Sequence, residues 1–228
     1  MSGPRIALIH ATPVAIEPIV SAFRRLWPEA RTTSLLEDSL APDLAEAGSI
    51  TQRLIERFVA LAHYAHSCGA DAVLFTCSAF GPAIEAAQAA LPIPVLKPNE
   101  AMFNEALAAG TRIGLLATFA PSVPALKAEL EQMARRRNSK IQISTLTVPS
   151  ALKALHAGQV EEHDRLIALA AEEIGNCDAL ILGQFSMAGA AANIPQRTGR
   201  RVLTSPTSAV MQLKRVLSEK AVEPATGG

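Results

Sequence analysis

The chain has 228 residues, of which 49% are hydrophobic, enough apolar material for one large α/β domain or two small ones, so disorder of its body is excluded. Lysine plus arginine and aspartate plus glutamate number 21 each, so no net charge attracts nucleic acid or an anionic membrane surface. No apolar run reaches the roughly 18 residues of a membrane-spanning helix, and we expect no membrane partner.

Short apolar runs rich in branched side chains predict strands. In chain order these runs lie at residues 6–9, 72–75, 95–96, 113–116, 141–146, 180–182 and 202–203. Most of them are continuous rather than alternating, which is typical of parallel strands covered on both faces.

Helical patterns separate the strands. The clearest covers residues 50–67, where Ser49 and Gln52 have the form of a capping box and Gly69 suits a C-terminal cap. A second helix is expected at 161–174 and a last one at 207–218. Alternation of strands with helices predicts βαβ units and a doubly wound parallel sheet.

An internal repeat divides the chain into two copies of one unit. RIALIHAT, DAVLFTC and PVLKP recur 107 positions later as RIGLLATF, DALILGQ and RVLTS. The fold class we expect is therefore α/β, with two pseudo-symmetric lobes. The first lobe would hold residues 1–97 plus the C-terminal helix within 207–228, and the second lobe residues 98–206.

Ligands of open parallel sheets bind at the carboxyl ends of the strands. Cys77 follows a strand of the first copy, and the repeat aligns it with Gln184 in the second copy. If the lobes face each other about a pseudo-twofold axis, these two side chains would lie on opposite sides of a cleft. We expect the functional site in that cleft.

Cys77 is the first candidate for catalysis. It precedes a helix that opens near Pro82, and the helix dipole and free N–H groups would stabilise its thiolate and lower its pKa. The alternative is a small buried apolar residue. Cys68 and Cys177 lie before strands, at the opposite end, and are expected to be structural. Three cysteines without a C-x-x-C pair argue against disulfides and zinc, and favour a reducing cytoplasm.

His10 ends the first strand and could act as an acid, a base or a group that orients the substrate. A histidine that is hydrogen bonded by neighbouring backbone is the interpretation we favour.

Hydroxyl groups dominate the remaining strand ends. Together with helix N-termini they would form a neutral cradle for a carboxylate, although Ser and Thr also cap helices there for structural reasons. The candidates for substrate binding are Thr12, Ser78, Thr118, Ser122 and Ser186. A small carboxylic acid is the expected ligand, and glycine-rich phosphate loops are absent from the sequence.

The segments FTCSAFGPAIEA from Phe75, GLLAT from Gly114 and LGQFSMAG from Leu182 resemble the aspartate/glutamate racemase superfamily, with its hydantoin racemases, maleate isomerases and arylmalonate decarboxylases. The resemblance implies an enzyme without a cofactor that uses one thiol on each face of the substrate α-carbon. It also implies that Cys77 is the first thiol and that Ser78 and Thr118 contact the carboxylate.

Gln184 departs from this pattern, because an amide cannot exchange a proton at ordinary pH. Three mechanisms stay open. The first is racemisation with Ser186 or His10 in place of the second thiol, and the second is decarboxylation in which one thiol protonates the enediolate while Gln184, as a second catalytic residue, and hydroxyls hold the developing oxyanion. The third is covalent addition of the thiol to an unsaturated acid. A non-catalytic binding protein is a further alternative. We expect a racemase or isomerase first and a decarboxylase second, with a homodimer as a possible assembly.

Overall fold

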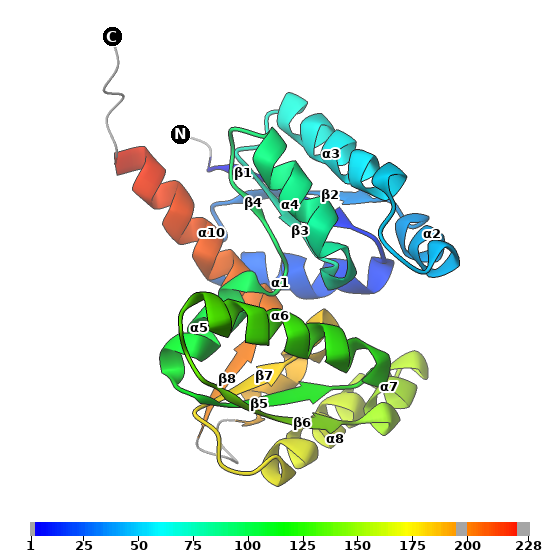
Figure 1. The fold of residues 1–228 in the computed structure, drawn as a ribbon, viewed down its shortest axis with the longest axis vertical. Helices are drawn as coiled ribbons and strands as arrows, with labels where there is room; N and C mark the ends of the chain where they lie inside the picture. Colours follow the sequence, from blue (N-terminus) through cyan, green and yellow to red (C-terminus); the bar gives the residue numbers. More distant parts are fainter. Residues whose placement is uncertain (1–2, 195–199, 223–228) are drawn as a thin grey trace. The chain divides into compact units, whose positions relative to one another are not determined.

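The computed structural model describes residues 3–194 and 200–222, and its strands form two four-stranded parallel sheets flanked by helices (Figure 1). The two sheets have the strand orders β2-β1-β3-β4 and β6-β5-β7-β8. The chain divides into two compact units, one with the described residues up to Pro98 and from Ala209 onward, the other with Asn99–Ser208. The expected fold class is confirmed.

In the first unit the strands are β1 (Arg5–His10), β2 (Arg31–Leu36), β3 (Ala72–Phe75) and β4 (Val95–Leu96). The helices are α1 (Ile16–Leu26), α2 (Leu40–Ala47), α3 (Gln52–Ser67) and α4 (Gly81–Ala90), with 3₁₀ turns η1 (Pro13–Ala15) and η2 (Ser78–Phe80) after β1 and β3.

The core of the first unit lies between the sheet and α3 and α4. Ile9 and Phe75 of the central strands pack in one apolar cluster with Phe58 of α3 and Ile84 of α4. The rings of Phe58 and Phe75 stack with their centroids 4.9 Å apart. Burial of these side chains supplies the main drive for the helices to cover this face.

Helix α3 begins because Thr51 caps it: its hydroxyl accepts a hydrogen bond of 3.3 Å from the Leu54 N–H. The capping box expected at Ser49 is therefore wrong, since the helix starts two residues later than that pattern requires. Gly69, with a positive φ of 80°, follows the helix end as predicted.

In the second unit the strands are β5 (Arg112–Ala117), β6 (Gln142–Thr147), β7 (Ala179–Leu182) and β8 (Arg201–Thr204). The helices are α5 (Glu100–Ala109), α6 (Val123–Arg136), α7 (Pro149–His156) and α8 (Val160–Glu173), with 3₁₀ turns η3 (Ala120–Ser122) and η4 (Phe185–Ala192).

Both faces of the second sheet are covered. On one face Ile181 of β7 packs with Phe103 of α5 and Leu130 of α6, and on the other Leu182 packs with Ile167 of α8. Consecutive residues of a strand point to opposite faces, so a strand buried on both sides has the continuous apolar sequence observed here.

The last helix, α10 (Ser205–Val222), begins two residues earlier than expected. From Ala209 onward it belongs to the first unit, where Lys214 Nζ donates to the Leu26 carbonyl at the end of α1 (3.4 Å). Residues 223–228 of the expected C-terminal helix lie outside the described residues. No helix in the described part of the chain has the length and apolarity needed to cross a membrane.

Strand β2 was not predicted. Its sequence RTTSLL is mostly polar, and none of its residues is fully buried, because it is an edge strand that is paired on one side only, with β1. The same edge position in the other sheet belongs to β6, whose apolar residues made it predictable.

Candidate active site

The carboxyl ends of β1, β3, β5 and β7 carry all eight residues that the sequence singles out. His10, Thr12, Cys77 and Ser78 belong to the first unit. Thr118, Ser122, Gln184 and Ser186 belong to the second. Each unit is described separately below.

Cys77 occupies the position just before the turn η2, in an extended conformation with φ −119° and ψ 118°. It is partly buried, and its sulfur packs at the border of the apolar cluster of the first unit. No side chain of the described residues donates a hydrogen bond to the sulfur. The side chain is therefore held by packing and by the backbone rather than by a polar partner.

Burial raises the pKa of the Cys77 thiol above its ordinary value, while the backbone of Ala79 acts in the opposite direction. The lowered pKa that we expected from the sequence is wrong. Helix α4 begins only at Gly81, after the 3₁₀ turn, so its dipole acts from several residues away, whereas desolvation acts at the sulfur itself. At neutral pH Cys77 is a neutral thiol.

His10 is fully buried and lies between two hydroxyl groups. Its Nδ1 is 2.9 Å from Thr76 Oγ1, and its Nε2 is 3.2 Å from Ser34 Oγ. Thr76 Oγ1 also lies 3.4 Å from the Ile9 carbonyl oxygen, which accepts from it. Burial lowers the pKa of His10 to about 4, which keeps the ring neutral at physiological pH.

This network joins three neighbouring strands: Ser34 lies within β2, His10 ends β1, and Thr76 follows β3 directly before Cys77. The partners of His10 are side chains and not the backbone groups that we expected. In this arrangement both ring nitrogens are engaged, so His10 supports the strand end that carries the thiol.

Thr12 and Ser78 keep their hydroxyl groups free. Thr12 is half-buried before η1 and makes no side-chain cap, and Ser78 is exposed at the start of η2. Neither hydroxyl bonds to a described residue, so both are available to a ligand.

In the second unit, Gln184 is clamped at both ends of its amide. Its Oε1 accepts from the Thr118 backbone N–H (2.8 Å) and hydroxyl (3.3 Å). Its Nε2 donates to Ser122 Oγ (2.7 Å), and Ser122 donates to the Phe119 carbonyl (2.7 Å). The amide thus ties the segment after β7 to the segment after β5 and keeps one N–H free.

Ser186 lies two residues beyond Gln184 in η4, is half-buried, and makes no hydrogen bond to a described residue. Its hydroxyl has no described partner, and neither has the buried hydroxyl of Thr204 at the end of β8, whereas Thr118 is almost fully buried and its hydroxyl is engaged by Gln184.

The other two cysteines lie near the amino ends of β3 and β7. Cys68 is exposed at the end of α3, and Cys177 is buried in the apolar cluster beneath α8. Their distance from the carboxyl ends agrees with the structural role that we expect for them.

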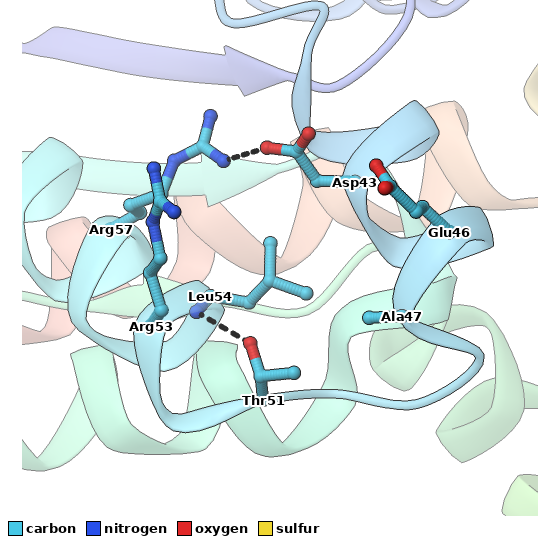
Figure 2. Close-up of a pocket in the computed structure, with 7 residues that line it drawn as sticks. All are labelled: Asp43, Glu46, Ala47, Thr51, Arg53, Leu54 and Arg57. Atoms are coloured by element: carbon cyan, nitrogen blue, oxygen red, sulfur yellow. Dashed lines mark hydrogen bonds and ion pairs between the residues drawn. The ribbon is translucent and has the colours of Figure 1, made fainter.

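A pocket of about 380 Å³ lies between α2 and α3 of the first unit (Figure 2). Figure 2 shows Arg57 directed toward Asp43, with which it forms an ion pair, and Thr51 at the start of α3. Arg57 also pairs with Glu37. None of the eight candidate residues lines this pocket, so its size alone does not make it the active site.

Sequence reasoning missed Ser34 and Thr76, the partners of His10. Ser34 could not be found because β2 itself was not recognised. Thr76 directly precedes Cys77 at the end of a buried strand. This position could have indicated that its hydroxyl supports the strand end that carries the thiol.

Two sheets of the same strand order, each with polar side chains after its central strands, define a duplicated α/β protein. The model of the Asp/Glu/Hydantoin racemase family matches residues 9–213, and the chain belongs to this family. The resemblance inferred from the sequence is thereby confirmed. No curated protein sequence matches the chain.

Solved structures of similar fold include allantoin racemase from Klebsiella pneumoniae, with a TM-score of 0.69 and 18% identity over 96% of this chain and 89% of the other. Glutamate racemase from Thermus thermophilus gives a TM-score of 0.66 and 20% identity over 99% and 84%. Unliganded arylmalonate decarboxylase gives 0.68 and 18% over 98% and 97%. At these identities the likeness establishes the fold.

Proposed function

We propose that the protein is a cofactor-independent enzyme that moves a proton at the α-carbon of a small carboxylic or amino acid, with Cys77 as the group that carries the proton. The observation that supports this most is the position of Cys77: a thiol without a polar side-chain partner at the carboxyl end of a central strand, in a chain of the racemase family. The leading reaction is racemisation or isomerisation.

The proposal gives the other strand-end residues distinct roles. The free hydroxyls of Thr12 and Ser78, which belong to the same unit as Cys77, hold the substrate carboxylate. Gln184 directs its remaining N–H to the oxygen that becomes negative when charge develops at the α-carbon. Thr118 and Ser122 hold Gln184 in place, because their hydrogen bonds fix both ends of its amide.

Racemisation requires Cys77 as a thiolate, which removes the α-proton, and a second group that returns a proton to the other face. Gln184 cannot do this, and in the first unit both nitrogens of His10 are engaged. Ser186 is the remaining candidate for the second group, because its hydroxyl is free.

Decarboxylation is the second candidate, and the raised pKa of Cys77 favours it. The bond between the α-carbon and one carboxylate breaks, carbon dioxide leaves, and the electron pair remains on the α-carbon as an enediolate. A neutral thiol then gives its proton to that carbon, and the resulting thiolate regains a proton from water. Arylmalonate decarboxylase is among the structural neighbours, which supports this alternative.

The experiment is to incubate the protein in deuterated water with enantiopure amino and hydroxy acids, with substituted malonates and with maleate, and to follow each by NMR and chiral chromatography. Loss of optical purity with solvent deuterium at the α-carbon supports racemisation. Carbon dioxide with a monodeuterated acid supports decarboxylation, and fumarate supports covalent isomerisation. Binding of an acid without any of these products contradicts an enzymatic function and favours a binding protein.

A further inference from the structure

The pocket between α2 and α3 of the first unit is lined by charged side chains that the proposed function does not use (Figure 2). Its volume of about 380 Å³ lies within the range of pockets that hold small molecules. Two carboxylates of α2 and two guanidinium groups of α3 line it: Asp43, Glu46, Arg53 and Arg57. All of them belong to the first unit, so the pocket is complete within that unit.

Arg57 is held by partners within the protein. Its guanidinium group forms ion pairs with Asp43 and Glu37 and donates to Ser39 Oγ (2.6 Å). These contacts join α3 to α2 and to the segment before α2, and the Arg57 side chain is 25% exposed. Its charge is therefore already balanced by two carboxylates, and this wall of the pocket is fixed without a ligand.

Glu46 and Arg53, in contrast, carry opposite charges on neighbouring helices and are not paired. Figure 2 shows them on opposite sides of the pocket, and neither side chain forms an ion pair or a hydrogen bond with a described residue. Glu56, three positions after Arg53 on the same helix, accepts from Gln52 Nε2 instead (3.2 Å). Arg57, four positions after Arg53, is a like charge and repels it. The pocket thus presents one unpaired anion and one unpaired cation that a ligand can bridge.

We propose that this pocket binds a small zwitterion, an α-amino acid, with its carboxylate on Arg53 and its ammonium group on Glu46. A guanidinium group holds a carboxylate through two parallel hydrogen bonds, and a carboxylate accepts strongly from an ammonium group. A ligand with a single charge would satisfy one of the two side chains and leave the other without a partner. Ala47 and the largely buried Leu54 provide apolar contact for the side chain of the amino acid.

This site is distinct from the one proposed around Cys77, and it does not depend on the reaction there. None of the eight candidate residues of the active site lines the pocket. An amino acid bound between α2 and α3 is therefore an additional ligand of the protein, whether or not the same amino acid is converted at Cys77.

The test is a titration of the isotopically labelled protein with leucine, followed by the amide NMR signals of α2 and α3, which report on this pocket. Two probes of the same shape each lack one charge: isocaproate has no ammonium group, and isoamylamine has no carboxylate. We expect leucine to shift these signals and to bind at least about tenfold more tightly than either probe, the difference that one hydrogen-bonded charge makes.

Two substitutions locate the effect, and two controls accompany them. Arg53→Gln and Glu46→Gln each remove one of the charges while keeping a polar side chain, and each should weaken leucine binding about tenfold. Arg136→Gln, which removes the charge of an exposed arginine at the end of α6, should leave this binding unchanged. Cys77→Ala should also leave it unchanged, because Cys77 does not line the pocket.

Leucine binding that requires both Arg53 and Glu46 supports the proposed site, whatever the reaction at Cys77. Isocaproate or isoamylamine that binds as tightly as leucine, or leucine binding that either substitution leaves unchanged, overturns it. Absence of shifts in α2 and α3 at millimolar leucine overturns it as well, even if the protein converts amino acids at Cys77.

Discussion

The carboxyl ends of β3 and β7 are equivalent positions of the repeat, yet their side chains are held in opposite ways. Cys77, after β3, has no polar side-chain partner, and the polar network of His10 lies next to it, buried within the sheet. Gln184, after β7, is itself bound at both ends of its amide. The end of β3 therefore presents a thiol that can gain or lose a proton, whereas the end of β7 presents an amide whose hydrogen bonds fix its position.

The residue before each of these side chains shows how the two ends diverged. Thr76 supplies a hydroxyl to the His10 network. Its counterpart is Gly183, where a Cβ atom would lie 2.9 Å from Leu126 Cδ1 and 3.0 Å from the Leu116 carbonyl oxygen. A network like that of the first unit therefore has no room in the second, although the strands have the same order.

The largest effect on stability is expected from acidification. The pKa of His10 is about 4 in the folded protein and about 6.5 when unfolded, so the unfolded chain binds more protons between these values and stability falls as the pH drops through this window. The expected loss is about 3 kcal/mol of unfolding free energy at pH 4 relative to pH 7.5. Urea titrations of the wild type and His10→Gln measure it.

His10→Gln should flatten this pH dependence, while His156→Gln, which replaces an exposed histidine, should keep the wild-type slope. Parallel profiles for the wild type and His10→Gln would contradict the buried, neutral histidine.

The second largest effect on stability is expected from truncation of Gln184, whose amide is hydrogen bonded to Thr118 and Ser122. Gln184→Ala leaves the N–H of buried Thr118 without its acceptor, and we expect a loss of about 2 kcal/mol together with a fall in turnover of roughly tenfold to a hundredfold. Denaturant unfolding and kinetics are measured on the same preparations. As a control, Ser186→Ala removes a hydroxyl that has no partner among the described residues and should leave stability unchanged; an equal loss there would argue against the clamp.

A smaller effect is expected at Gly183. Gly183→Ala adds one methyl group against Leu126 and a backbone carbonyl and should cost about 1 kcal/mol. Gly158→Ala is no suitable control because its φ of 75° strains any side chain. Gly81→Ala is suitable, since a Cβ there meets nothing within 4 Å. If Gly183→Ala is as stable as the wild type, steric exclusion does not explain the difference between the two strand ends.

The smallest effect is expected on the chemical reactivity of Cys77, after β3. Because burial raises its pKa, alkylation of Cys77 by iodoacetamide should rise with pH and reach its midpoint above that of free cysteine. The rate is measured in a Cys68→Ala and Cys177→Ala background, so that one thiol reacts. A midpoint below that of free cysteine would mean that the helix N-terminus outweighs desolvation.

Much of this comparison could be predicted from the sequence. The repeat aligned Cys77 with Gln184 and predicted two lobes of one fold. The strands could be predicted because burial of a parallel strand on both faces imposes a continuous apolar pattern. The polar edge strand β2 lacks that pattern, so Ser34 and the network of His10 stayed hidden. The pKa of Cys77 was predicted with the wrong sign, since sequence shows the nearby helix start but not the desolvation of the sulfur.

The hydrogen bonds that join Thr118 and Ser122 to Gln184 also could not be predicted from the sequence. Both were expected to touch the substrate carboxylate, and in the structure both are hydrogen bonded to Gln184. Hydroxyls at strand ends serve ligands and neighbouring side chains equally well, and only the positions of the donors distinguish the two uses.

The central claim is that the sulfur of Cys77 carries the proton, and it is tested most directly by solvent deuterium incorporation at the α-carbon of a converted acid. We predict that the wild type and Cys68→Ala incorporate deuterium at equal rates and that Cys77→Ala loses at least about a hundredfold, the usual contribution of a general acid or base. Incorporation by Cys77→Ala at the wild-type rate would contradict the account.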